Sequence, residues 1–148
     1  MRALLFAALL ATAGCTCAPP CTPGQLSCAC RSGAQCDDGT CTDGKCVAPP
    51  MVGLVVSDAA ARGCEVLLAE APGTTIAKAT FNSGVQGVSL RQAPQLAVTF
   101  VAPADAPLPS GGVTLALTSG ALSGVTVTKA TCVDSKGARL PNATVSLR

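Results

Sequence analysis

The chain has 148 residues, a length that fits one ordinary domain or two small ones. Apolar residues make up 49% of it and charged residues 12%, about half the charged share of an average soluble domain. Trp, Tyr and His are absent, Phe occurs three times, and the formal net charge is +2. We therefore expect no nucleic-acid partner, because basic surface and aromatic platforms are lacking, and catalysis by His is excluded.

The first fourteen residues have the pattern of an export signal. Arg2 supplies a positive charge, residues 3–10 form an unbroken apolar run, and small residues follow as far as Gly14. The run is too short for a membrane-spanning helix, which needs roughly 20 apolar residues. The pattern predicts a signal peptide of the lipoprotein type over residues 1–14.

Two cleavage routes are open at the end of this leader. Residues 13–15 (AGC) resemble the end of a bacterial lipobox, in which Cys15 becomes the lipidated first residue, although Thr12 stands where Leu is usual. The alternative is ordinary cleavage after Ala13, which releases a periplasmic or secreted protein. Lipidation leaves nine other cysteines, with Cys17 unpaired, whereas release leaves an even number. We predict lipidation at Cys15, and hence attachment to the outer membrane or cell surface.

A cysteine-rich segment follows, with the spacing C-x6-C-x-C-x5-C-x4-C-x4-C and turn-forming Asp-Gly pairs between the cysteines. Leu26 is its one large apolar side chain between the first and last of these cysteines, so the segment cannot build a hydrophobic core. We predict a loop-dominated module over residues 15–47 in which disulfides replace that core. Their pairing stays open, although Cys28 and Cys30 are not expected to bond to each other. The six cysteines are Cys21, Cys28, Cys30, Cys36, Cys41 and Cys46.

The alternatives to disulfides and turns in this segment are a zinc site formed by the cysteines and a calcium site formed by the aspartates. Zinc sites favour C-x2-C spacing, often with His, and export favours oxidised cysteines. Asp37, Asp38 and Asp43 do not have the ligand spacing of an EF-hand calcium loop and suit tight turns instead. We therefore expect no metal and no cofactor.

Residues 21–47 (CTPGQLSCACRSGAQCDDGTCTDGKCV) resemble the short cysteine-rich head of bacterial surface lipoproteins. Ser27 departs from that pattern, which often has Gly at this position. The resemblance implies a location at the cell surface and does not imply an activity. The matching positions are Cys21, Pro23, Gly24, Cys28, Cys30, Cys36, Gly39, Cys41, Gly44, Cys46 and Val47.

Residues 48–50 (APP) form a short stiff linker, and the composition then changes to Val, Leu, Thr, Ala and Gly. Short segments with period-two alternation recur between turn signals, as where Leu96, Val98 and Phe100 share one face. Residues 51–148 are therefore predicted to form an all-β domain, an antiparallel β-sandwich. A single helical turn is expected at 58–62, capped by Asp58. The predicted strands are 51–57, 64–69, 75–81, 85–91, 95–101, 113–119, 124–132 and 144–147.

Cys64 and Cys132 are the last two cysteines, and in an exported domain we expect them to form a disulfide. Residues 95–147 resemble the second half of cohesin-type and related Ig-like sandwiches, in which a hydrophobic strand is followed by a strand that ends in a polar turn. Here that turn is residues 133–137 (VDSKG). The resemblance implies an Ig-like or cohesin-like sandwich and carries over no binding residues.

Three functions remain open. The first is a non-catalytic envelope lipoprotein whose sandwich binds an envelope protein or a polysaccharide, or packs into a surface assembly. The second is a secreted protease inhibitor that presents the Arg31-Ser32 loop. The third is an envelope enzyme, which needs carboxylates converging in a pocket. No residue is predicted to be catalytic, and the candidates for that third function are Glu65, Glu70, Asp105 and Asp134.

Overall fold

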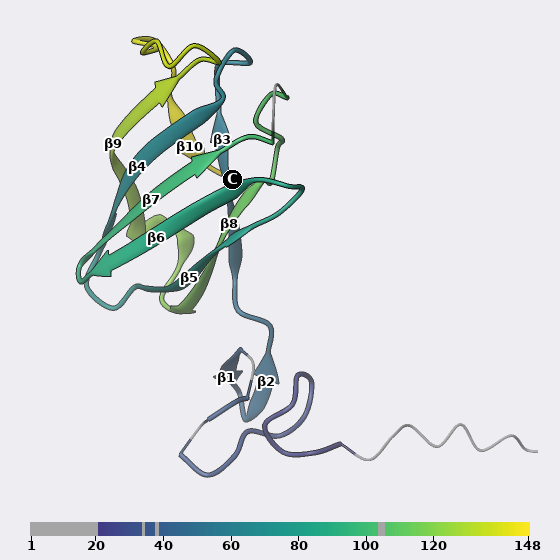
Figure 1. Cartoon of the computed structure of the whole chain (residues 1–148). Helices are drawn as coiled ribbons and strands as arrows, with labels where there is room; N and C mark the ends of the chain where they lie inside the picture. Colours follow the sequence, from purple (N-terminus) through teal and green to yellow (C-terminus); the bar gives the residue numbers. More distant parts are fainter. Residues whose placement is uncertain (1–20, 34, 38, 104–105) are drawn as a thin grey trace, which may run out of the picture.

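The structure, a computed structural model, describes residues 21–33, 35–37, 39–103 and 106–148. They form a small disulfide-rich head and a larger β-sandwich, which a single segment joins in Figure 1. The leader, Cys15 and Cys17 lie outside the described residues. Within the described part, no helix has the length and apolar character needed to cross a membrane.

The head contains one antiparallel hairpin, formed by β1 (Thr40–Thr42) and β2 (Lys45–Val47). Asp43 and Gly44 connect the two strands with φ angles of 50° and 76°, as a two-residue type I′ turn requires. The sequence predicted this Asp-Gly turn but did not predict the two strands, because three residues are too few to show an alternating pattern.

All eight strands predicted for the body are present, and their ends agree with the prediction to within one residue. Pro and Gly turns end most of them, which is why the boundaries were readable from the sequence. The strands are β3 (Met51–Val56), β4 (Gly63–Glu70), β5 (Thr75–Phe81), β6 (Gln86–Gln92), β7 (Gln95–Val101), β8 (Val113–Ser119), β9 (Val125–Val133) and β10 (Val145–Leu147).

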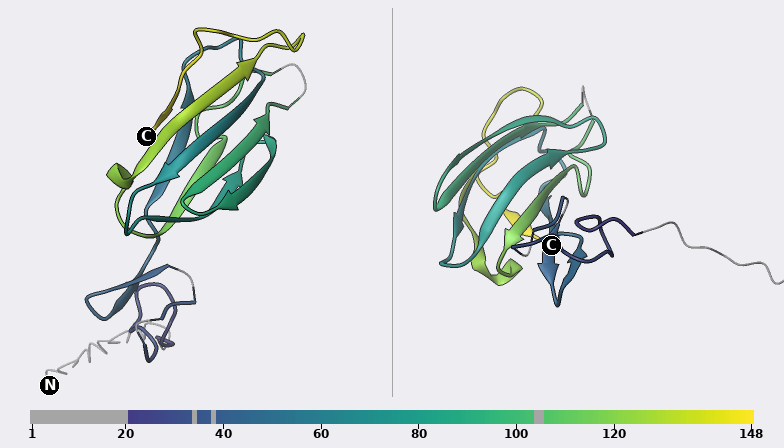
Figure 2. Two further views of the ribbon diagram at one scale, coloured as in Figure 1. Left: turned by 90° about the vertical axis from the view of Figure 1, so that its left-hand side faces the viewer. Right: turned by 90° about the horizontal axis from the view of Figure 1, so that it is seen from below.

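The strands form two four-stranded sheets, ordered β10-β3-β8-β5 and β6-β7-β4-β9, and every pairing is antiparallel. The chain passes from one sheet to the other at every connection except the β6–β7 hairpin. Figure 2 shows the two layers from the side and from below. This arrangement confirms the predicted all-β antiparallel sandwich.

The core lies between the sheets and follows the period-two pattern of the sequence. On β7, Leu96, Val98 and Phe100 are at most 3% exposed. Their neighbours on the chain face outward or are half-buried. The facing sheet contributes alternate residues of β8 in the same way, and β4 contributes Val66 and Leu68. The inward positions of β8 are Val113, Leu115 and Leu117.

Two short connections complete the sandwich. The helical turn predicted at 58–62 is absent: residues 58–61 form a tight turn in which the Ala61 N–H donates to the Asp58 carbonyl at 3.1 Å. The Asp58 carboxylate accepts the Ala60 N–H at 2.8 Å, which closes an Asx turn and caps no helix. A 3-10 turn, η1 (Leu122–Gly124), precedes β9 and was not predicted.

Candidate functional site

Three disulfides hold the head together. They join Cys21 to Cys28, Cys30 to Cys41 and Cys36 to Cys46, with Cα–Cα distances of 5.5, 5.8 and 5.7 Å. Cys28 and Cys30 bond to different partners, and Cys46 is fully buried at the centre of the module. The bonds take the place that a hydrophobic cluster has in a larger domain.

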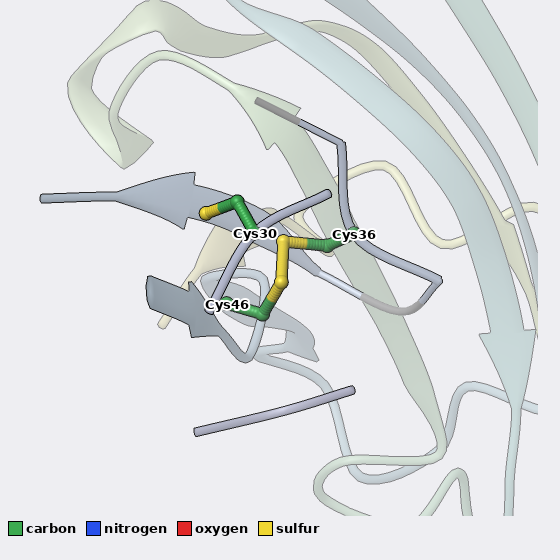
Figure 3. Close-up of side chains that lie close together, drawn as sticks. All are labelled: Cys30, Cys36 and Cys46. Atoms are coloured by element: carbon green, nitrogen blue, oxygen red, sulfur yellow. A yellow bond between two sulfur atoms is a disulfide. The ribbon is translucent and has the colours of Figure 1, made fainter. Parts of the chain in front are cut away.

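The sulfur atoms of Cys30, Cys36 and Cys46 lie within 4.8 Å of one another (Figure 3). This is the spacing of a three-cysteine metal site. Figure 3 also shows the disulfide between Cys36 and Cys46. The sulfur of Cys30 is bonded to that of Cys41, which the figure does not draw. Because a thiolate and not a disulfide sulfur ligates metal, these residues serve as crosslinks in the oxidised protein.

The loop proposed for protease inhibition is closed by a hydrogen bond from the Arg31 N–H to the Gln35 carbonyl at 2.8 Å. The Arg31 side chain is 53% exposed, and its guanidinium is hydrogen-bonded to other residues of the head. It donates to Asp37 Oδ2 at 2.8 Å and to the Pro23 carbonyl at 3.1 Å. A protease that uses Arg31 as its specificity residue would first have to break both contacts.

An ion pair between the buried Glu70 and the exposed Arg91, not predicted from the sequence, lies at the end of the sandwich where β4 and β6 end. The Glu70 side chain is 3% exposed and accepts both Arg91 Nη2, at 2.7 Å, and Arg91 Nε, at 3.3 Å. It also accepts the Ile76 N–H at 2.7 Å. Hydrogen bonding from Arg91, opposed by burial, lowers the pKa of Glu70 below its ordinary value.

This pairing fixes the role of Glu70. Both carboxylate oxygens accept hydrogen bonds, and the group ties β4 to the start of β5 and to the far strand β6. A general acid needs a proton near neutral pH, and a lowered pKa removes it. The carboxylate therefore acts as a structural clamp between the two sheets.

The other carboxylates do not converge with it. Glu65 is exposed on the outer face of β4, five residues from the inward-facing Glu70, as the alternation predicted. Asp134 Oδ1 accepts the N–H groups of Lys136 and Ala138 at 2.8 and 2.9 Å, and these bonds lower the pKa of Asp134. Glu65 and Asp134 line two adjoining hollows that share Gly63, Val101 and Val133. Glu70 lines a third hollow apart from them, and Asp105 lies outside the described residues.

A further hollow of about 220 Å³ opens between the sheets near the end of β3. Its walls are mainly apolar, and its one titratable side chain, Asp58, is already bonded to the Ala60 N–H. The volume falls below the roughly 300–1,000 Å³ of most small-molecule sites. Its lining includes Leu54, Val85, Phe100, Leu108 and Val113.

Cys64 and Cys132 form the fourth disulfide among the described residues. They lie directly opposite each other on the neighbouring strands β4 and β9, with a Cα–Cα distance of 4.1 Å. The bond therefore crosslinks strands within one sheet and does not bridge the two sheets. Disulfides of this number indicate a protein that folds in an oxidising compartment outside the cytosol.

No protein-family model matches this chain, and a comparison with curated proteins gives no match either.

Proposed function

We propose that this protein is an exported, non-catalytic lipoprotein of the bacterial cell envelope. A lipid on Cys15 would hold it at the outer membrane or cell surface. The head would act as a covalently stiffened spacer, and the sandwich as a binding or structural module. Its partner in that role would be another envelope protein or a polysaccharide.

The observation that carries this proposal is the position of the disulfide-built head directly after the apolar leader. Three disulfides lie between Cys21 and Cys46, and the first begins six residues after Cys15. A segment stapled in this way keeps its shape without a core, so it suits a position between a membrane and a folded domain.

The described carboxylates support a non-catalytic role. Glu70 is held by Arg91, Asp134 closes a turn, and Glu65 stands alone on an exposed sheet face. Acid–base catalysis needs at least one such group with an unoccupied proton position beside a substrate cleft.

The intact mass of the mature native protein tests the proposal. We expect acyl mass on a chain that begins at Cys15, and a mass increase on reduction that corresponds to four disulfides. A Cys15→Ser variant, which cannot be lipidated, provides the matched control. A non-acylated native chain that begins at Gly14 would contradict the anchor, and a native mass unchanged by reduction would contradict export.

A further inference from the structure

Strand β6 is an open edge of the sandwich. It is the last strand of its sheet, pairs with β7 alone, and lies along the front of the sandwich in Figure 1. All seven of its residues are exposed. The outward backbone groups of such a strand form a template for pairing with another strand.

The other three edge strands carry features that discourage such pairing. On β5, the exposed Lys78 is accompanied by two irregularities in the pairing with β8. On β9, the exposed Lys129 lies beside a break in the register with β4. Strand β10 is only three residues long. These are recognised devices against edge-to-edge association.

β6 lacks the exposed Lys and the breaks in register of those strands, and its one inward-pointing charge is compensated by the ion pair with Glu70. It contains no Lys and no Pro, and its register with β7 is unbroken from Gln86 to Gln92. Its single charged residue, Arg91, is bonded to Glu70. Val88 and Leu90 are 70% and 74% exposed, more than any other large hydrophobic residue of the described part.

These two side chains lie on the outer face of the sheet. Val88 is opposite Thr99 and Leu90 is opposite Ala97, which are the outward positions of β7. The inward positions of β6 are Gly87, Ser89 and Arg91, whose partners on β7 include the buried Phe100 and Val98. An added strand would therefore extend an apolar stripe on the outer face.

The strand is self-complementary about Ser89. Its sequence is Gln-Gly-Val-Ser-Leu-Arg-Gln, which places an apolar residue on each side of Ser89 and a glutamine at each end. If a second copy pairs antiparallel with Ser89 opposite Ser89, Val88 faces Leu90 of the second copy. Arg91 then faces the small Gly87, so no two like charges meet.

We propose that β6 binds β6 of a second copy of this chain, about a two-fold axis through Ser89. The two outer sheets become one continuous sheet, and Val88 and Leu90 of both copies cover one another. An interface of seven residues a side is smaller than the roughly 1,200–2,000 Å² of standard interfaces. We therefore expect a weak dimer whose formation depends on protein concentration. The inference holds with or without the lipid, so its failure would leave the proposed location untouched.

Cysteine crosslinking tests the register. In the full exported chain, Ser89→Cys brings two thiols opposite each other and is expected to give a disulfide-linked dimer on a non-reducing gel. Gln92→Cys, on the same exposed strand, is the matched control, because its two copies would lie about 20 Å apart along the strands. Equal dimer yields from the two variants would overturn the proposed register.

Sedimentation velocity tests the surface. The full chain with Cys15→Ser and Cys17→Ser, which removes the lipidation site and the two cysteines outside the described residues, is expected to shift from monomer to dimer as concentration rises. Val88→Lys with Leu90→Lys should abolish the shift, whereas Val101→Lys, exposed on the neighbouring strand, should retain it. A starting protein that stays monomeric up to about millimolar concentration, or a lysine pair that still dimerises, refutes the proposal.

Discussion

Removal of the disulfide between Cys64 and Cys132 should cost a large share of the stability of the sandwich. The bond closes a loop with a sequence separation of 68. Chain-entropy arithmetic for a loop of that length gives about 4 kcal/mol at 25 °C. The total for a domain of this size is about 5–15 kcal/mol, so the loss is a substantial fraction of it.

The assay is equilibrium urea unfolding of the full chain carrying Cys64→Ala and Cys132→Ala. Because the chain has no Trp or Tyr, circular dichroism of the strands is the signal to follow. The two positions are 4% and 1% exposed, so Ala leaves them apolar without adding an unpaired hydroxyl. We expect the free energy of unfolding to fall by about 4 kcal/mol.

The matched control removes a short-loop disulfide from the head. Cys21 and Cys28 are separated by 7 residues, for which the same arithmetic gives about 2 kcal/mol, confined to the head. In this control variant the urea concentration at the midpoint of the unfolding of the sandwich should therefore be unchanged. A loss below about 1 kcal/mol for the sandwich variant would refute the reasoning, and so would an equal shift of that transition by the head variant.

Two more predictions concern the carboxylates. Since Arg91 lowers the pKa of Glu70, the native carboxylate contributes stability above its unfolded pKa, about 4.5, and loses it as pH falls through the lower folded value. Glu70→Gln should lower the free energy of unfolding by about 1–3 kcal/mol at neutral pH. It should also reduce the loss of stability that the unmodified protein shows as the pH falls into the acid range; both effects are measured by urea unfolding. Asp134→Ala should speed amide hydrogen exchange at Lys136, because the amide loses its acceptor.

Each carboxylate has a control on the same element. Glu65→Gln changes the exposed carboxylate of β4 and should leave the loss of stability at acid pH as in the unmodified protein. Asp134→Asn keeps a side-chain oxygen in the turn, so the Lys136 amide should exchange more slowly in this variant than in Asp134→Ala. If Glu70→Gln retained the full loss of stability at acid pH, or if Asn and Ala at position 134 exchanged alike, the assigned roles would be wrong.

The strands of the body could be predicted because local and long-range requirements coincide in them. Residues 95–101 and 113–119 alternate apolar and small or polar side chains, and only a strand places each set on one face. Pro, Gly and Asn then interrupt the pattern between strands. The two-layer sandwich follows, because each sheet has one apolar face to bury.

The Glu70–Arg91 pair could not be predicted in the same way. The alternation of side chains along β4 does indicate that Glu70 faces inward, since it follows the buried Val66 and Leu68 at every second position. Its partner, however, lies on β6, and β7 stands between the two strands. The order of strands in a sheet is a property of the whole chain path, so no local pattern at Arg91 reveals that contact.

The pairing of the head cysteines could not be predicted from the sequence for a related reason. Each of the six cysteines has several partners within reach of so short a segment, and turns rather than strand periodicity set which ones meet. The hairpin of β1 and β2 places Cys41 opposite Cys46, yet each bonds outside the hairpin, to Cys30 and Cys36. Proximity within the hairpin therefore does not decide the pairing.

The two edges of the β6-β7-β4-β9 sheet are stabilised unequally, and this bears on what the sandwich is for. The β9 edge is tied to β4 by the Cys64–Cys132 bond and carries Lys129. The β6 edge is held through β7 and the Arg91–Glu70 pair, and it exposes its two largest apolar side chains to solvent. Val88 and Leu90 are the most exposed large hydrophobic residues of the described part, and exposed apolar side chains on an unpaired edge are a liability for an isolated monomer. Their retention beside three blunted edges is explained if this edge is where the sandwich meets another strand.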